Sequence, residues 1–199
     1  MENSKPLAPV VWIGIVLLGA CTRLIPHPWN FTPLVAIGLF AGTYARSAGA
    51  AAAVTLLSLI LSDLALGFYQ GFWVVYAAAL IPVLAGRLAA KRANAHNAFA
   101  VHLLSAHNAF AVRLPAMAVI AGAGLASSLS FFLITNFGVW AGGALYPRTL
   151  AGLAACYAAG IPFYRNQLAG DVFYVLLMFG GYAAIARLWT TRASAQASA

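Results

Sequence analysis

Charged residues are scarce in this chain of 199 residues. Only 7% of the residues are Asp, Glu, Lys or Arg, three of them are acidic, and 63% are hydrophobic. A soluble globular domain carries about 25% charged residues, so the composition excludes a water-soluble globular enzyme and indicates a lipid bilayer as the solvent. The two cysteines are too few for a disulfide framework. The net charge of +8 comes mostly from segments expected at one membrane edge, which argues against nucleic acid as a partner.

Hydrophobic runs predict an all-α, polytopic membrane protein with one transmembrane bundle over residues 1–199. Six spans are expected, at about residues 9–24, 32–44, 49–67, 72–89, 114–135 and 168–188. The second run is short, and it either extends into the next small-residue stretch or fails to cross the whole hydrocarbon layer. A further apolar stretch at residues 150–159, bounded by Pro147 and Pro162, suits a short interfacial or re-entrant helix.

The first hydrophobic run ends in Leu-Gly-Ala-Cys at residues 18–21, which imitates the cleavage site of a lipoprotein signal. The segment before the run carries one Lys and one Glu, and the rest of the chain is membrane-like. We therefore interpret the first run as a span that is retained.

Lys and Arg are distributed unevenly between the two sides of these six spans. With the N-terminus inside, eight lie in cytoplasmic segments and three outside. The inner set is Lys5, Arg46, Arg87, Lys91, Arg92, Arg113, Arg187 and Arg192, and the outer set is Arg23, Arg148 and Arg165. The positive-inside rule then predicts a multi-pass protein of the bacterial cytoplasmic (inner) membrane with both termini cytoplasmic.

The cytoplasmic loop at residues 90–113 contains a near-tandem repeat with a period of 11, in which residues 94–104 are followed by 105–115. His96, His102 and His107 fall here, but no carboxylate or cysteine accompanies them. We interpret the repeat as a recent duplication, and a metal-binding tract is the alternative.

Small residues recur at helix-contact spacing in two spans, as Gly38 and Gly42 and as Ala118, Gly122 and Ala126. Such ridges let helix backbones approach closely in lipid. They predict packing inside the bundle, with docking of a separate membrane partner as the alternative.

Polar and aromatic side chains gather on the outer side, whereas the inner loops offer mainly Ala, Lys, Arg and the repeat. This pattern predicts a solute-binding site that faces outward. The candidate substrate-binding residues are Arg23, His27, Asn30, Asp63, Tyr69, Gln70, Asn136, Trp140, Tyr146, Arg148, Tyr157, Arg165, Asn166 and Asp171. The aromatic members form either a lipid-interface belt or part of a pocket.

Asp63 and Asp171 lie inside apolar segments, about one turn from the outer membrane edge. An unpaired charge there costs several kcal/mol. We expect both carboxylates to face the bundle interior, either in a structural ion pair with Arg23, Arg148 or Arg165, or in contact with substrate.

His27 lies between two prolines in a stiff turn, and we interpret it either as a lid residue or as a solvated loop residue.

Several motifs together resemble a family of small, uncharacterised integral membrane proteins over about residues 23–188. They are Arg-Leu-Ile-Pro-His-Pro-x-Asn-Phe-Thr-Pro at 23–33, Leu-Ser-Asp-Leu-x-Leu-Gly at 61–67, Asn-Phe-Gly-Val-Trp at 136–140, and the run from Tyr-Pro-x-Thr through Cys-Tyr-x-Ala-Gly-Ile-Pro-Phe-x-Arg-Asn to Gly-Asp at 146–171. More distantly, the six-helix plan is similar to the substrate-capture (S) components of energy-coupling-factor vitamin transporters, including solitary cobalamin-binding members of Gram-negative bacteria.

The resemblance to S components implies an extracytoplasmic face that closes over a vitamin-sized solute, with the first and third interhelical loops as lids. S components that dock a shared energising module carry Ala-x-x-x-Ala in the first helix. Residues 10–20 lack this pattern, which puts an energising partner in doubt and leaves a solitary carrier as the alternative.

The expected ligand is a vitamin or cofactor precursor. The outer arginines outnumber the two buried acids by one, and with the aromatic rings they suit a ring-bearing solute with a carboxylate, phosphate or amide periphery. Cobalamin is one candidate, since Cys156 and His27 lie on the outer side and could reach its cobalt. A small helix-packing residue is the alternative for Cys156.

Three functional classes remain open from the sequence. Solute capture for uptake is favoured because the outer polar set lacks a nucleophile paired with a base. The alternative is an intramembrane enzyme in which Asp63 and Asp171 act as an acid/base pair or hold a cation, with the outer arginines on a lipid phosphate. No HExxH, GxSxG or phosphate-cradling Gly loop supports it. A membrane assembly protein is the third class.

Overall fold

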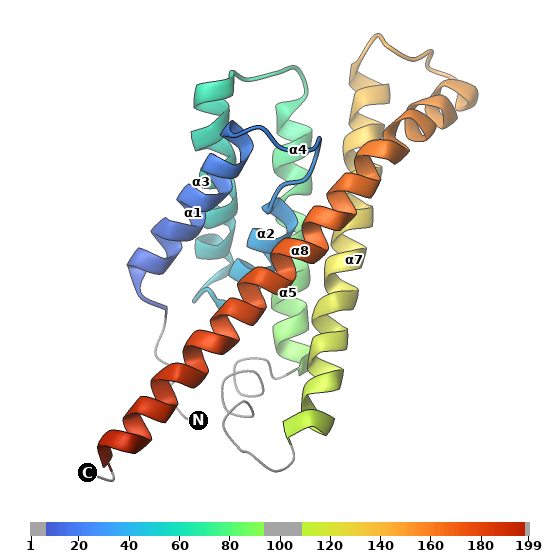
Figure 1. Ribbon diagram of the computed structural model, residues 1–199. Coiled ribbons are helices and arrows are strands. Elements are labelled where there is room, and N and C mark those ends of the chain that lie inside the picture. Colours follow the sequence, from blue (N-terminus) through green and yellow to red (C-terminus); the bar gives the residue numbers. More distant parts are fainter. Residues whose placement is uncertain (1–6, 94–108, 198–199) are drawn as a thin grey trace.

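The computed structural model describes residues 7–93 and 109–197, with side chains placed at 7–92 and 117–186. Within these ranges the chain is helical apart from short connections, and it contains no strand, so the all-α prediction is confirmed. The helices, drawn in Figure 1, are α1 (Pro9–Leu24), α2 (Leu34–Tyr44), α3 (Ala48–Leu66), α4 (Phe72–Ala78), α5 (Leu80–Ala93), α7 (Ala109–Gly142) and α8 (Leu150–Ala197).

Helix α2 is the centre of the bundle. Its residues 34–43 are all buried, and α1, α3, α5, α7 and α8 pack around it. A helix that is apolar on every face is expected to be buried in this way. Its closest neighbour is α5, because a Cβ atom on Gly42 would come within 2.2 Å of the Val83 carbonyl oxygen, and one on Gly86 within 2.2 Å of the Leu39 carbonyl oxygen. The Gly38 and Gly42 ridge therefore packs inside the bundle.

Four helical segments are long and apolar enough to cross a membrane: Ala48–Leu66, Phe72–Arg92, Met117–Gly142 and Leu150–Ala186. Helices α1 and α2 have 16 and 11 residues, which at about 1.5 Å per residue is roughly 24 and 17 Å. The hydrocarbon core is about 30 Å thick. Four of the six expected spans are therefore long enough to cross the membrane as helices, and the count of six is not confirmed because α1 and α2 are shorter.

The fourth expected span is interrupted at Ala79, where α4 ends and α5 begins. Pro82 lies one turn later and has no backbone N–H, so the helical hydrogen bond to the carbonyl of Ala78 cannot form. The ring of Pro82 lies against α2, 2.9 Å from where a Cβ atom on Gly38 would stand.

Helix α8 corrects the prediction for the C-terminal third of the chain. Instead of a short helix at 150–159 and a separate span at 168–188, residues 150–197 form one continuous helix with Pro162 inside it. Thr149 accepts a hydrogen bond from the Gly152 amide (3.1 Å) and so caps its start. Proline is tolerated within a transmembrane helix when neighbouring groups compensate for the lost bond, and Pro162 therefore did not end the helix.

The connection between α5 and α7 is shorter than the loop expected at 90–113. Helix α5 continues to Ala93 and α7 begins at Ala109, because Ala, Lys, Arg and Leu are strong helix formers that prolong a helix beyond its apolar run. Most of the repeat, including His96, His102 and His107, lies outside the described residues.

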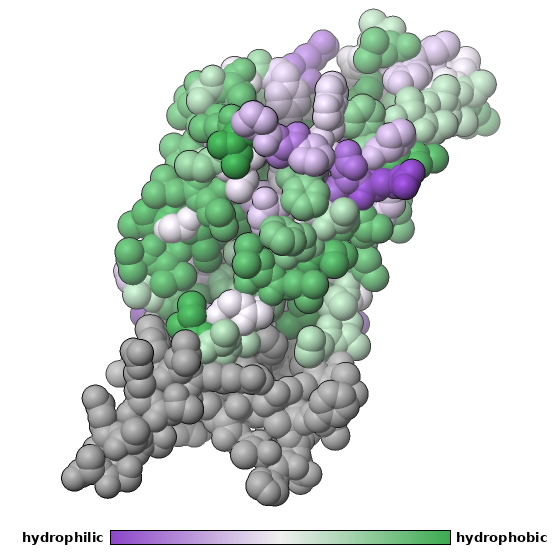
Figure 2. Space-filling view, in the orientation of Figure 1, coloured by the Kyte–Doolittle hydropathy of each residue, from purple (hydrophilic) through white to green (hydrophobic). Residues whose placement is uncertain are grey.

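Apart from α4 and α5, which follow one another in the same direction, successive helices run in opposite directions, so the connections gather at two ends of the bundle (Figure 1). The end that contains residues 25–33, 67–71 and 143–149 is called the upper end. Figure 2 shows hydrophobic side chains over the middle of the visible face and polar side chains gathered toward this upper end. Arg46 and the end of α5, with Lys91, belong to the opposite end.

Candidate functional site

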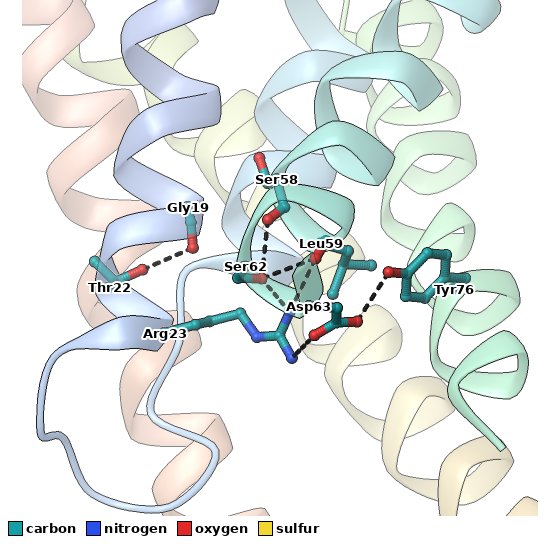
Figure 3. A network of polar contacts seen from close by, with 8 residues as sticks. All are labelled: Gly19, Thr22, Arg23, Ser58, Leu59, Ser62, Asp63 and Tyr76. Carbon is teal, nitrogen blue, oxygen red and sulfur yellow. Dashed lines mark hydrogen bonds and ion pairs between the residues drawn. The ribbon is translucent and has the colours of Figure 1, made fainter. Parts of the chain in front are cut away.

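An ion pair joins α1 to α3 just below the upper end. An Nη atom of Arg23, in the last turn of α1, lies 2.8 Å from Oδ1 of Asp63, in the last turn of α3. Tyr76 of α4 donates a hydrogen bond of 2.8 Å to the other oxygen of the same carboxylate. Figure 3 shows Arg23 and Tyr76 reaching Asp63 from different sides. Asp63 is fully buried, so these contacts replace its hydration.

The close approach of α1 and α3 explains why Arg23 meets Asp63. A Cβ atom on Gly19 would lie 2.8 Å from the Ser58 hydroxyl oxygen, so no larger residue fits there. The two helices run in the same direction (Figure 1), and residues four positions later on each helix lie on the same face. Arg23 therefore comes opposite Ser62 and Asp63.

Hydroxyl and carbonyl groups complete the surroundings of the guanidinium. Its second Nη atom donates to the Ser62 hydroxyl, and to the Leu59 carbonyl at 3.4 Å. The Ser62 hydroxyl in turn lies 2.8 Å from the Leu59 carbonyl oxygen. Arg23 is thus held by a charge, a hydroxyl and a carbonyl, which is the environment that a mostly buried cation requires.

A pocket of about 280 Å³ opens beside this ion pair. It lies between the loop that joins α1 and α2 and helices α2, α4, α7 and α8. Its walls mix polar and apolar side chains: Arg23, Asn30, Thr32, Leu34, Val35, Tyr69, Val75, Phe131, Thr135, Asn136, Val139, Gly160, Phe163, Gln167 and Asp171.

The α1–α2 loop is fixed against α8 where it borders the pocket. A Cβ atom on Gly170 would lie 3.1 Å from the Cα atom of Phe31, and the Phe31 ring packs against Phe173 and Tyr174 at centroid distances of 5.9 and 5.7 Å. Asn30 lines the pocket with a φ angle of 63°, in the left-handed region that Asn tolerates better than most residues. The loop is therefore a fixed part of the pocket wall.

Asp171 is the second buried acid, and its surroundings differ from those of Asp63. It is 4% exposed, and its side chain lies against Ser128 and Gln167. The amide nitrogen of Gln167 donates to the carbonyl and hydroxyl oxygens of Ser128, at 2.9 and 3.1 Å. The Oδ2 atom of Asp171 is buried without a hydrogen-bond partner. No Lys or Arg side chain that the structure describes forms an ion pair with it.

Tyr69, in the middle of the α3–α4 connection, adds a phenol to the pocket wall. Burial raises its pKa, the nearby Asp63 raises it further, and Arg23 partly offsets the effect. The phenol therefore stays protonated at neutral pH and can both donate and accept a hydrogen bond.

Five of the predicted site residues line the pocket: Arg23, Asn30, Tyr69, Asn136 and Asp171. Asp63 lies behind Arg23. The expectation that both acids face the interior is confirmed, and Arg23 is the partner of Asp63.

The other predicted residues lie outside the pocket wall. Gln70 donates to the Gly142 carbonyl at 3.4 Å, the Trp140 indole to the Pro147 carbonyl at 3.0 Å, and Tyr157 to the Leu133 carbonyl at 2.8 Å. These bonds join connecting segments and helices. Arg148 and Arg165 are exposed, and Tyr146 and Asn166 are half-buried.

The two cobalt-ligand candidates do not meet at the pocket. The thiol of Cys156 is buried and donates to the Asn136 carbonyl at 3.4 Å, which matches the helix-packing alternative. Nδ1 of His27 lies 2.7 Å from the Ile25 carbonyl oxygen within its own loop. Over the described residues no group of three or more His, Cys, Asp or Glu side chains could hold a metal ion.

Sequence reasoning missed the polar residues inside the spans that support the site. Tyr76, Ser62, Ser128 and Gln167 contact one of the two acids or Arg23. A usable signal was present, since Gln167 precedes Asp171 by four residues and therefore shares its helix face.

The comparisons give a family but no function. The model of a family described as "Family of unknown function (DUF6580)" matches residues 3–194, so the chain belongs to that family. No curated protein and no solved structure matches the chain.

Proposed function

We propose that this member of DUF6580 captures a small water-soluble solute in the pocket beside Arg23 and Asp171 for uptake across the membrane, in the manner of the S components that it resembles. The observation that carries the proposal is a pocket with buried polar groups at one end of an apolar bundle. A buried carboxylate with an unpaired oxygen costs stability. A purely structural or lipid-facing role does not explain why the protein contains one.

The size of the pocket favours a solute no larger than a vitamin precursor. Its volume of about 280 Å³ lies near the lower limit of ligand pockets, which run from about 300 to 1,000 Å³. Cobalamin, a corrin macrocycle with a nucleotide tail, is much larger. Since Cys156 and His27 do not line the pocket, we favour an organic solute bound without metal ligation.

The proposed location is the bacterial cytoplasmic membrane, with both termini in the cytoplasm and the pocket on the extracytoplasmic face. The support is the excess of Lys and Arg in the segments expected inside, which include Arg46 and the end of α5. In this topology the chain crosses the membrane six times, and at α1 and α2 the helix covers part of the crossing while the adjoining residues cover the rest. Helix α1 lacks Ala-x-x-x-Ala, so the proposed function does not include docking to an energising module.

Solute capture accounts for the geometry better than an intramembrane enzyme does. An acid/base pair must reach the same substrate from a common space. Asp63 is held by Arg23 and Tyr76 and does not line the pocket, whereas Asp171 does. A membrane assembly protein remains the outcome to expect if the pocket binds nothing.

Mass spectrometry of small molecules that co-purify with the detergent-solubilised protein tests the proposal. Thr135→Trp places an indole in the pocket, while Ser130→Trp adds the same group to the same helix outside the pocket wall. We expect a compound that is retained by the wild type and by Ser130→Trp and lost from Thr135→Trp. The same small-molecule profile in all three proteins would contradict solute capture at this pocket.

A further inference from the structure

We propose that the solute carries a protonated amine that binds the carboxylate of Asp171. The inference rests on the proposed function, since it assigns the chemistry of the same pocket. It replaces the sequence-based expectation of a ligand with a carboxylate, phosphate or amide periphery, which assumed that Arg23, Arg148 and Arg165 all face the site.

The ionisable side chains at the pocket are one guanidinium and two carboxyl groups. Arg23 and Asp171 are the charged residues of its wall. Asp63 stands behind Arg23 and pairs with it, so one positive charge faces two carboxylates. Arg148 and Arg165, which would reverse this balance, are exposed and outside the wall.

Arg23 is poorly available to an anionic ligand. One of its Nη atoms contacts Asp63, and the other contacts the Ser62 hydroxyl and the Leu59 carbonyl. An anion approaching the guanidinium would also approach the Asp63 carboxylate 2.8 Å from it, and like charges at such short range repel strongly in a low-dielectric site.

Asp171 lacks a charged partner of the kind that Asp63 has in Arg23. Ser128 and Gln167 supply neutral contacts, yet Oδ2 is buried with no hydrogen-bond partner. An ionised carboxylate accepts hydrogen bonds only, so the partner that holds Asp171 in its charged form is a donor. Because a buried charge is stabilised best by an opposite charge that also donates hydrogen bonds, a protonated amine is the group that fits.

The rest of the wall indicates the remainder of the solute. Leu34, Val35, Val75, Phe131, Val139 and Phe163 are apolar or aromatic. They suit a short hydrocarbon chain or one ring attached to the amine. Asn30, Thr135 and Asn136 can bond to a polar group on that skeleton.

Three probes that share one skeleton test the sign of the charge: 2-phenylethylamine, 2-phenylethanol and phenylacetate. Each is added at the same millimolar concentrations to the full-length protein in an uncharged detergent, and the thermal unfolding midpoint is followed by tryptophan fluorescence. We expect the amine to raise the midpoint and to bind at least tenfold more tightly than the alcohol, with the acid weakest.

Asp171→Asn is the matched variant, since it removes the charge and retains the size of the side chain. We expect the tenfold preference for the amine to disappear in Asp171→Asn and to persist in Asp171→Glu, which restores the charge. Circular dichroism and gel filtration establish that each variant is folded. If Asp171→Asn does not fold, the inference is tested by the ranking of the three probes on the wild type and by whether Asp171→Glu keeps the preference for the amine.

The outcomes separate this inference from the proposed function. Equal or tighter binding of the alcohol or the acid, or a co-purifying compound without a protonated amine, would overturn the inference and leave solute capture standing. An amine preference that survives in a folded Asp171→Asn protein would overturn the role of Asp171. Binding of none of the probes, together with no co-purifying compound, would overturn both.

Discussion

The two buried acids illustrate how the neighbours of a carboxylate determine its role. Asp63 contacts a guanidinium and a phenol, so its charge is compensated within the protein. Asp171 contacts a hydroxyl and an amide and keeps one oxygen without a partner. The same substitution at the two positions should therefore change stability in opposite directions.

Asp63→Asn should destabilise the protein strongly. The substitution leaves the Arg23 guanidinium mostly buried, with its side chain only 14% exposed, and without a counter-charge. Breaking one partner of a buried pair costs about 3–5 kcal/mol. Chemical unfolding in detergent micelles measures this loss, and a change below 1 kcal/mol would mean that the pair is effectively solvent-exposed.

Asp171→Asn should stabilise the ligand-free protein by about 1–3 kcal/mol, because it exchanges a buried carboxylate that has no counter-charge for a neutral amide of the same size. The amide can still bond to Ser128 and Gln167, the present neighbours of the carboxylate. The same unfolding experiment applies, with Asp63→Asn as the comparison. A loss as large as that for Asp63→Asn would indicate a structural role for Asp171.

Residue types and spacing could predict part of this site. Charged residues in apolar segments must face inward, which placed Asp63 and Asp171 in the interior and made Arg23 a partner candidate. The sequence could not assign Arg148 and Arg165 to the exposed surface, since that depends on how α7 and α8 meet. The pairing of Gln167 with Ser128 joins positions 39 residues apart and likewise requires the fold.

At the scale of helices, glycines decide which elements come close enough to build the pocket. Gly19 lets α1 reach α3, Gly42 and Gly86 let α2 reach α5, and Gly170 admits the α1–α2 loop to α8. Each contact would place an added Cβ atom at 3.1 Å or less from a neighbouring atom. The periodic pattern could predict such a contact for Gly38 and Gly42, but it also suggested one at Gly122, where nothing lies within 4 Å.

Gly42→Ala and Gly122→Ala therefore form a matched pair. At Gly42 the added methyl group meets the Val83 carbonyl oxygen at 2.2 Å, so α2 and α5 must separate, and overpacking of this kind costs about 1–3 kcal/mol. At Gly122 the methyl group has room, and Ala favours the helix by about 0.5–1 kcal/mol. Thermal midpoints that move in the same direction for both variants would contradict this account.

For the whole molecule, composition predicted the helical membrane bundle. It could not predict how long each helix is, and therefore which hydrophobic runs form full-length spans. Hydrophobicity locates a run but does not reveal whether lipid or other helices surround it. The run at 32–44 became a short helix buried in the centre. The runs at 150–159 and 168–188 joined into α8 because the cost of Pro162 can be met within a bundle.

Cysteine accessibility tests the proposed topology of the whole chain. In a background with Cys21→Ser and Cys156→Ser, Leu145→Cys lies in the upper-end connection, where Leu145 is 81% exposed, and Arg46→Cys lies at the opposite end. An impermeant maleimide added to intact cells should label position 145 and spare position 46 until the cells are opened. The reverse pattern would place the pocket in the cytoplasm.

The burial of α2 also has an evolutionary consequence. Residues 34–43 touch protein on every side, and two of them, Leu34 and Val35, border the pocket. On α1, by contrast, Val10, Ile13 and Leu17 are more than half exposed, at 70, 58 and 51%, and any lipid-compatible side chain can replace them. Family members should therefore drift freely along the outer face of α1, while α2, despite its plain apolar composition, should diverge most slowly.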